Sequence, residues 1–372
     1  MIFSIYIHIP FCKYKCYYCD FVSYPLIDHD LFDRYVKRLI EEIGWWHRLF
    51  PDATLYTAYI GGGTPSVLPL SLLEKIVDAL HQWNSPMEFT IEANPDDISP
   101  EWVKNVISMG INRISVGIES LSEYMLKAWG RKHTVEDSLR SMDVLRSLSV
   151  NFNVDMIYPT YLPKGYSIEF EDELQRVLEF SPFHISIYMM DLHQGTMAET
   201  LVRKGQWLEV DDDVILNDMK AVNEILLESG FHHYEISNYA VNGYESLHNI
   251  VYWQQEFYIG VGVSAWGLIS GVRYQNLPTL RYYLEGDIRR NYTRLLGKEW
   301  LVDYGLMALR LINRGIQRFR WQQLGGNWEE LIDRAKEIDC VDWSSESVFL
   351  KDDVACVMVS TSIIEEMLEP WL

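Results

Sequence analysis

The sequence predicts an α/β fold: a partial (β/α)6 barrel followed by a smaller C-terminal α+β domain. Three observations lead to this prediction. Short apolar runs alternate with amphipathic stretches over roughly the first half of the chain. The apolar runs are near-continuous, as expected of parallel strands that are covered on both faces. With 48% hydrophobic and 23% charged residues, the 372-residue chain has enough apolar material for a large core.

Six apolar runs are expected to form the parallel strands, at residues 2–9, 54–61, 88–93, 113–118, 152–158 and 184–190. Parallel neighbours need crossover connections, so the stretches between the runs are expected to be helices. The clearest amphipathic patterns lie at residues 31–46, 71–83, 101–110 and 135–149. Another long amphipathic pattern follows Asp211–Asp213, which we interpret as a solvated helix start and not as a metal site. Residues 1–230 are therefore assigned to the barrel.

The remainder of the chain departs from this alternation. Residues 231–296 are rich in Tyr, Gly, Asn and His without a helical period, so we expect irregular structure or short strands packed on the barrel. Helical patterns return within residues 304–315 and 327–338, and a short strand pair is expected within 347–360. Residues 297–372 are accordingly predicted to form the C-terminal domain.

Charge and cysteine content limit the environment of the protein. The 32 basic and 53 acidic residues give a net charge of −21, which repels nucleic acids and anionic lipid surfaces. The sequence has no export signal and no apolar stretch long enough to span a membrane. Five cysteines are a poor framework for disulfides. We therefore expect a cytoplasmic, reducing location, with Cys340 and Cys356 as ordinary small core residues.

Three cysteines directly after the first strand form the most specific motif. Cys12, Cys16 and Cys19 have the spacing C-x3-C-x2-C. Thiolates select zinc, copper or iron-sulfur centres. A structural zinc site needs four protein ligands, whereas a cubane held by three thiolates keeps one iron open to another ligand. The alternatives are a zinc site completed by a distant histidine and three buried structural thiols.

The spacing, followed immediately by Asp20 and Phe21, resembles the signature of the radical S-adenosylmethionine (radical SAM) superfamily. The resemblance implies a radical SAM partial barrel whose [4Fe-4S] cluster is held by Cys12, Cys16 and Cys19. It further implies an enzyme in which SAM binds the open iron and is cleaved reductively to a 5′-deoxyadenosyl radical. The reductant would be a protein such as flavodoxin or ferredoxin.

Further motifs narrow the resemblance within this superfamily. YIHIPFC, YCDF, GGGTPS, EANP, RISVGIES, GRKHT, HYEISNYA and HNIVYW are similar to the oxygen-independent coproporphyrinogen III oxidase group, and most similar to its haem-chaperone (HemW) branch. The oxidase carries another cysteine where this chain has Phe21, which argues against porphyrinogen decarboxylation. The haem-chaperone branch implies binding and transfer of haem. His248 of the HNxxYW motif would then be an axial iron ligand.

The motifs at strand ends supply the candidate SAM contacts. In α/β barrels the chemistry gathers at the carboxyl ends of the strands. Gly61–Gly63 follow the second strand and lack Cβ atoms, so their backbone can approach a ligand closely. By resemblance, Tyr6, Gly62 and Glu92 match the site of the cluster-bound SAM. The alternatives without a ligand are a tight turn for the glycines and a solvated carboxylate for Glu92.

A second group of residues resembles a second SAM site of the oxidase: Tyr18, Gly63, Thr64, Arg131 and Asp155. Glu119 takes the place of a residue that is usually Gln in the family, which removes two donors and adds a charge. Together with Arg131 and Asp155 it is a candidate catalytic and cofactor-binding residue. The alternative is that these three side chains form salt bridges with one another.

Departures from the family pattern cluster on the substrate side, at residues 158–165, 189–196 and Ala265–Trp266. They leave two further hypotheses beside the haem chaperone. One is a class C radical SAM methyltransferase or cyclopropanase that uses two SAM molecules on a small aromatic natural-product substrate. The other is an iron-sulfur electron-transfer module without SAM turnover.

Overall fold

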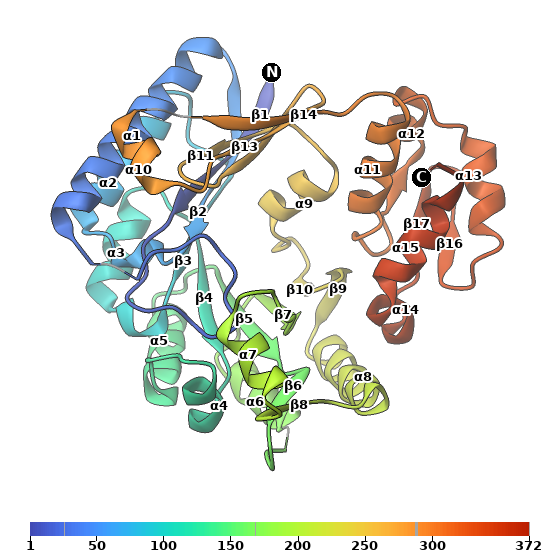
Figure 1. Ribbon diagram of the computed structural model, residues 1–372, viewed down its shortest axis with the longest axis horizontal. Coiled ribbons are helices and arrows are strands. Elements are labelled where there is room, and N and C mark those ends of the chain that lie inside the picture. The colour runs from blue at the N-terminus through green and yellow to red at the C-terminus, as the bar shows by residue number, and fades with distance from the viewer. Residues whose placement is uncertain (26, 168, 287–288, 372) are drawn as a thin grey trace.

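The computed structural model describes residues 1–25, 27–167, 169–286 and 289–371 (Figure 1). Its main body is a 12-stranded sheet in the order β14-β13-β12-β11-β1-β2-β3-β4-β5-β7-β10-β9. The six predicted strands are confirmed as its centre, where each pairs in parallel with the next. The order is open at β14 and β9, so the barrel is partial, as expected. The central strands are β1 (Ile2–Ile9), β2 (Thr54–Gly62), β3 (Glu88–Ala93), β4 (Arg113–Glu119), β5 (Phe152–Tyr158) and β7 (His184–Met189).

Residues 231–296 extend both edges of this sheet. On one edge β11 pairs in parallel with β1, and the next three strands follow antiparallel. On the other edge β10 pairs antiparallel with β7 and with β9. Of the two expected forms, irregular structure or short strands, the structure shows short strands; at four or five residues they are too short to show a clear period. The added strands are β9 (Phe231–Glu235), β10 (Asn238–Val241), β11 (Tyr258–Val261), β12 (Trp266–Ile269), β13 (Val272–Asn276) and β14 (Arg290–Arg294).

Most helices cover the outer face of the sheet, whereas α9 (Leu247–Trp253) packs against β2 from the inside (Figure 1). Asp28 caps the first of them, and Asp211 caps α8 as the sequence predicts. No helix among the described residues is both long and apolar enough to cross a bilayer. A small separate sheet pairs β6 (Tyr161–Pro163) with β8 (Trp207–Glu209). The helices are α1 (His29–Leu49), α2 (Leu70–Leu80), α3 (Pro100–Ser108), α4 (Glu123–Ala128), α5 (Val135–Ser147), α6 (Phe170–Leu178), α7 (Met197–Arg203), α8 (Asp212–Glu228), α9 (Leu247–Trp253) and α10 (Leu280–Glu285).

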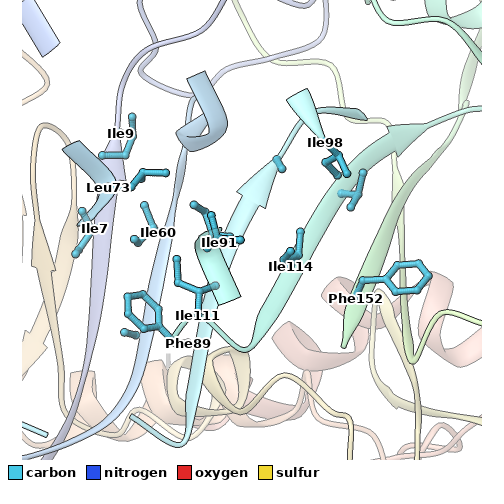
Figure 2. Packing of buried hydrophobic residues seen from close by; sticks show 14 of the residues in the cluster. Ile7, Ile9, Ile60, Leu73, Phe89, Ile91, Ile98, Ile111, Ile114 and Phe152 are labelled. Atoms are coloured by element: carbon cyan, nitrogen blue, oxygen red, sulfur yellow. The ribbon is translucent and has the colours of Figure 1, made fainter. Parts of the chain in front are cut away.

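The two faces of the central strands differ in polarity. Alternate residues such as Ile7, Ile60 and Ile91 point toward the covering helices and form the buried core (Figure 2). The residues between them are polar and hydrogen-bond across the inner face, for example Thr57 to Ser4 at 2.7 Å. The central strands are thus covered on both faces, as expected, but their inner face is polar. The sequence conceals the alternation because several inward side chains are small hydroxyls or tyrosines.

The C-terminal residues form a second hydrophobic cluster around Trp321, Leu331 and Leu350. The expected strand pair within 347–360 is only half present, because residues from Val354 onward are helical. Cys340 and Cys356 form a disulfide, which corrects their assignment as ordinary core residues. The elements here are α11 (Lys298–Ala308), β15 (Ile316–Gln317), α12 (Arg318–Gln323), α13 (Trp328–Ala335), β16 (Val341–Trp343), β17 (Ser347–Leu350), α14 (Val354–Met358) and α15 (Ser360–Leu368).

One buried carboxylate joins α1 to the sheet extension. Glu42 is 1% exposed and forms an ion pair with Arg290 at 2.6 Å. It also accepts hydrogen bonds from Tyr283 (2.7 Å), Asn276 (3.0 Å) and the backbone N–H of Gly262 (3.0 Å). A buried charge costs free energy unless its partners are in place, so these contacts hold β11, β13 and β14 in register with the helix.

We expect Glu42→Ala to lower the free energy of unfolding by about 3 kcal/mol, because it leaves the Arg290 charge buried without its partner. Urea unfolding followed by circular dichroism measures this change. Glu41→Ala, at the exposed neighbouring position, is the matched control and should shift stability by less than about 0.5 kcal/mol. Equal unfolding midpoints for Glu42→Ala and the parent would show that the ion pair contributes nothing.

Candidate functional site

The loop that carries the three cysteines is tied to the carboxyl ends of the strands by its backbone. The N–H groups of Gly63 and Thr64 donate to Ile9 and Phe11 carbonyl oxygens at 2.7 and 2.8 Å. Cys12 N–H donates to the Tyr24 carbonyl at 3.1 Å, which closes the base of the loop. The position of this loop over the sheet is therefore determined by main-chain contacts.

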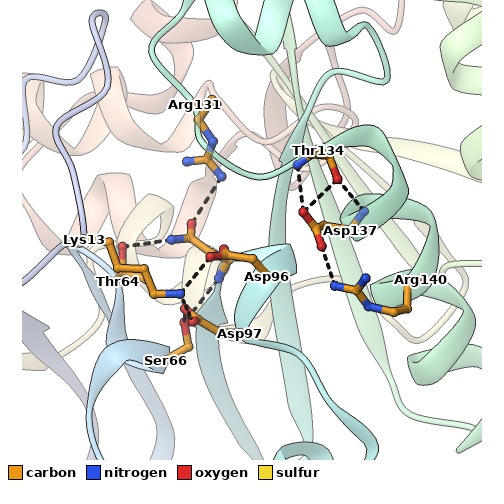
Figure 3. Close-up of polar contacts among 10 residues, drawn as sticks. Lys13, Thr64, Ser66, Asp96, Asp97, Arg131, Thr134, Asp137 and Arg140 are labelled. Atoms are coloured by element: carbon orange, nitrogen blue, oxygen red, sulfur yellow. Dashed lines mark hydrogen bonds and ion pairs between the residues drawn. The ribbon is translucent and has the colours of Figure 1, made fainter.

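Side chains fasten the same loop at two more points. Lys13 forms ion pairs with Asp96 and Asp97, which follow β3 (Figure 3). The buried His8 ring contacts the Val22 carbonyl at 2.9 Å through Nε2. Burial lowers the pKa of His8 to about 4. The ring is therefore neutral near pH 7, and its Nε2–H group can donate a hydrogen bond to the Val22 carbonyl oxygen.

Cys12, Cys16 and Cys19 are free thiols that line one pocket of about 440 Å³. Burial raises the pKa of Cys12, and it raises the pKa of Cys19 to about 11. Within the described ranges, no three His, Cys, Asp or Glu side chains surround a single ion position. The thiols thus share a pocket large enough for a cluster, and a bound metal would replace their protons.

The glycine run brings the backbone against this loop. A Cβ at Gly63 would lie 2.6 Å from the Phe11 carbonyl oxygen and 3.0 Å from the Cys12 sulfur, so a side chain cannot fit there. Gly62 has φ +112°, a conformation that favours glycine. Its N–H donates to Glu92 at 3.0 Å, and Tyr59 donates to the other oxygen of this carboxyl group at 2.8 Å. Gly62, Gly63 and Glu92 therefore lie together at the pocket wall, as the motifs predict.

Near neutral pH, the carboxyl group of Glu92 is partly protonated and partly ionised. Burial raises its pKa to about 7, although the hydrogen bonds from Tyr59 and Gly62 oppose this rise. No cation contacts Glu92 among the described residues. A positively charged ligand group beside it would restore the ordinary ionised form.

Arg131 connects the second group of predicted residues to the cysteine loop. Its Nη2 donates to the Gly117 carbonyl at 2.7 Å and to the Asn94 side chain at 3.2 Å. Its Nη1 lies 3.6 Å from the Cys16 sulfur and 3.6 Å from Glu119. Its Nε is buried without a partner. The salt-bridge interpretation thus holds for Arg131 and Glu119.

Glu119 and Asp155 differ in their surroundings. Glu119 ends β4 with φ 65°, an uncommon conformation for a residue other than glycine. Burial raises its pKa to about 7, against the opposing effect of Arg131. Asp155 accepts hydrogen bonds from Ser115 at 2.8 Å and Asn153 at 2.7 Å, and burial raises its pKa as well. Both carboxyl groups line the pocket with Tyr18 and Thr64.

Two predicted residues, Tyr6 and His248, do not line the pocket. Tyr6 contacts His8 at 3.0 Å, one layer below the pocket wall. His248 is fully buried, and its ring nitrogens contact the hydroxyls of Thr57 and Tyr252, each at 2.7 Å. Burial lowers its pKa to about 3. In this structure the ring is a hydrogen-bonded core group that α9 packs against β2, and the assignment of His248 as an axial haem ligand stays a prediction.

Several pocket residues were not predicted from the sequence. Asn94 links Arg131 to Thr64, whose hydroxyl lies 3.5 Å from the Cys12 sulfur. Its place in the EANP motif, directly beyond a strand end, was an available signal. Ser115 lies within the RISVGIES motif, and Met190 and His193 lie within the atypical segment 189–196, although no role was predicted for them. The remaining lining residues belong to no motif: Tyr14, Tyr59 and Tyr188.

A family model of the radical SAM superfamily matches residues 6–177. The heme chaperone HemW of Lactococcus lactis is 37% identical over 315 residues, which are 82% of this chain and 81% of that protein. The Bacillus subtilis heme chaperone HemW is 33% identical over 76% of this chain and 75% of its own length. This chain belongs to the HemN/HemW-like group of radical SAM proteins.

A solved structure agrees with this membership of the HemN/HemW-like group. Coproporphyrinogen III oxidase (HemN) from Escherichia coli matches with a TM-score of 0.80, covering 99% of this chain and 89% of that one. At 20% identity this likeness shows the fold. The radical SAM match includes the cysteine loop, the glycine run and Arg131, and it ends before His193 and His248.

The pKa of Glu92 predicts a pH-dependent stability in the cofactor-free protein. Between pH 4.5, where the carboxyl group titrates in the unfolded chain, and about pH 7, the folded protein holds a proton that the unfolded chain has released. The free energy of unfolding therefore loses a contribution on the order of 2 kcal/mol as the pH rises from about 5 to about 7. Urea unfolding at both pH values should show a shallower fall in Glu92→Gln.

Glu101→Gln, on the exposed side of α3, is the matched control for this measurement. Its pH dependence should follow that of the parent. If Glu92→Gln instead ran parallel to the parent between the two pH values, the raised pKa of Glu92 would be disproved.

Proposed function

We propose that this protein holds a [4Fe-4S] cluster through Cys12, Cys16 and Cys19, cleaves SAM reductively, and binds haem for transfer to other proteins. One observation carries the proposal: three free thiols share a pocket with a glycine backbone and a buried carboxyl group. The relatives named as heme chaperones support the haem part. A three-thiolate cluster keeps one iron open for SAM.

The residues of the pocket suit the recognition of SAM. When bound, the cluster supplies the electron that cleaves the sulfonium. We assign Glu92 to the amino group of SAM, because an ammonium would stabilise its ionised form. The backbone of Gly62 and Gly63 would flank the ligand, since no Cβ occupies that space. Tyr59 and Gly62 hold the Glu92 carboxyl group in position.

The second group of residues supports a second ligand position in the same pocket. Arg131, Glu119 and Asp155 all line the pocket, and Arg131 forms an ion pair with Glu119. We propose that this group binds the carboxylate or ribose of SAM, with one SAM molecule or two in the pocket. Two molecules are what the alternative of a class C methyltransferase or cyclopropanase on a small aromatic substrate requires.

We also propose a protein reductant such as flavodoxin or ferredoxin, and a cytoplasmic location. The cysteine loop supports both, because its thiols must remain reduced to hold a cluster. Tyr17 and Phe21 on this loop are 38% and 63% exposed, so an electron donor can approach the cluster from that side. The disulfide between Cys340 and Cys356 is far from the loop in sequence and takes no part in this site.

Anaerobic reconstitution of the full chain tests the proposal. The parent should bind about four irons and four sulfides. With dithionite and SAM it should release 5′-deoxyadenosine, which chromatography detects. Cys16→Ala should lose most of the iron and all of this product, because two thiolates cannot hold the cluster.

The double variant Cys340→Ser/Cys356→Ser is the matched control, because it also removes cysteine sulfur but leaves the pocket intact. It should retain the iron, the sulfide and the product of the parent. Stoichiometric zinc without sulfide in the parent would contradict the proposal. A complete cluster that never yields 5′-deoxyadenosine would instead favour an electron-transfer module.

A further inference from the structure

The proposed haem binding needs an iron ligand other than His248. Haem proteins hold the iron through imidazole, thioether or thiolate groups. An imidazole must present a free ring nitrogen, whereas both nitrogens of His248 are within 2.7 Å of a hydroxyl. Its side chain is also fully buried. Ligation by His248 would break two buried hydrogen bonds and displace α9 from β2.

His193 has the free ring nitrogen that His248 lacks. It lies in the loop between β7 and α7, lines the pocket, and its side chain is 46% exposed. Its Nδ1 lies 3.6 Å from a carboxylate oxygen of Asp20, which directly follows Cys19. Nε2 has no hydrogen-bond partner among the described residues. A carboxylate on one ring nitrogen orients a histidine whose other nitrogen binds a metal.

The surroundings of His193 suit a flat apolar ligand. Met189, Met190 and Tyr188 precede it and line the same pocket, and Phe21 lines the pocket from the cysteine loop. Phe21 is 63% exposed and Tyr188 43%, so both present aromatic surface to the pocket mouth. Lys15 lines the pocket as well. Its ammonium group donates to the Phe21 carbonyl at 2.5 Å and the Ser23 hydroxyl at 2.9 Å, so its third proton remains for an anionic ligand edge. A porphyrin combines such apolar faces with carboxylates at its edge.

We propose that His193 is the axial ligand of a haem bound at the pocket mouth. Nε2 donates its lone pair to the iron in place of water, while Nδ1 keeps its proton and directs it toward Asp20. The apolar faces of the porphyrin lie against Phe21 and Met189, and its carboxylates extend toward Lys15. No redox change accompanies this ligand exchange. The inference rests on the proposed haem-binding function and names the residue that performs it.

Ferric haem titrated into the reconstituted full chain tests the assignment through the Soret band and the electron paramagnetic resonance spectrum. The parent should give an imidazole-ligated spectrum with saturable binding. His193→Ala should lose this spectrum and weaken binding by more than about tenfold, and millimolar imidazole should restore the spectrum. Asp20→Asn should keep the ligand but weaken binding by at most about tenfold, because only the orienting charge is lost.

His81→Ala is the matched control, because His81 is an exposed histidine at the end of α2 that does not line the pocket. It should bind haem like the parent. Iron and sulfide content, together with circular dichroism, should be equal in all variants, which separates a lost ligand from a lost fold.

The outcomes separate this inference from the proposed function. If His193→Ala binds haem with the spectrum of the parent, the assignment of His193 is overturned while haem binding stands. Equal losses in His193→Ala and His81→Ala would mean adventitious binding to surface histidines, which also overturns it. If the parent binds no haem, the haem part of the proposed function falls, and the assignment of His193 falls with it. Reductive cleavage of SAM, measured separately, is independent of all three results.

Discussion

The parallel order of the six central strands is the constraint on which the site depends. It brings the carboxyl ends of β1 to β5 and β7 to one edge, so that loops distant in sequence meet there. The cysteine loop after β1 contacts the glycine run after β2 through main-chain hydrogen bonds. Arg131, beyond β4, reaches the Cys16 sulfur and the Asn94 side chain. The three thiols are therefore placed by the sheet, before any metal or ligand contributes.

The inner face of the sheet carries the polar side chains of the site, and many of these side chains are buried. Toward the amino ends of the strands, Glu88 accepts the N–H groups that begin α9, and Thr57 contacts His248. Toward the carboxyl ends, burial raises the pKa values of Glu92 and Glu119 to about 7. Perturbed carboxyl groups in a pocket indicate a candidate site for a charged ligand.

Much of this arrangement could be predicted from the sequence, because its signals are local. The six strands show as apolar runs. The cysteine loop follows a strand, and the glycine run and Glu92 lie at the carboxyl ends of strands. Features that depend on tertiary contacts could not be predicted. The pairing of Cys340 with Cys356, the burial of His248 by α9 and the link through Asn94 all arise from packing between distant segments. His193 carried no motif, since its role depends on the place of Asp20 across the pocket.

The most direct test of the account is the electron paramagnetic resonance spectrum of the dithionite-reduced, reconstituted protein, recorded with and without SAM. If three thiolates hold the cluster and one iron is open, SAM must become a ligand of that iron and shift the g values of the signal. The account predicts this shift in the parent protein. A [4Fe-4S] signal that is identical with and without saturating SAM would contradict it, because the fourth iron would then be closed by another ligand.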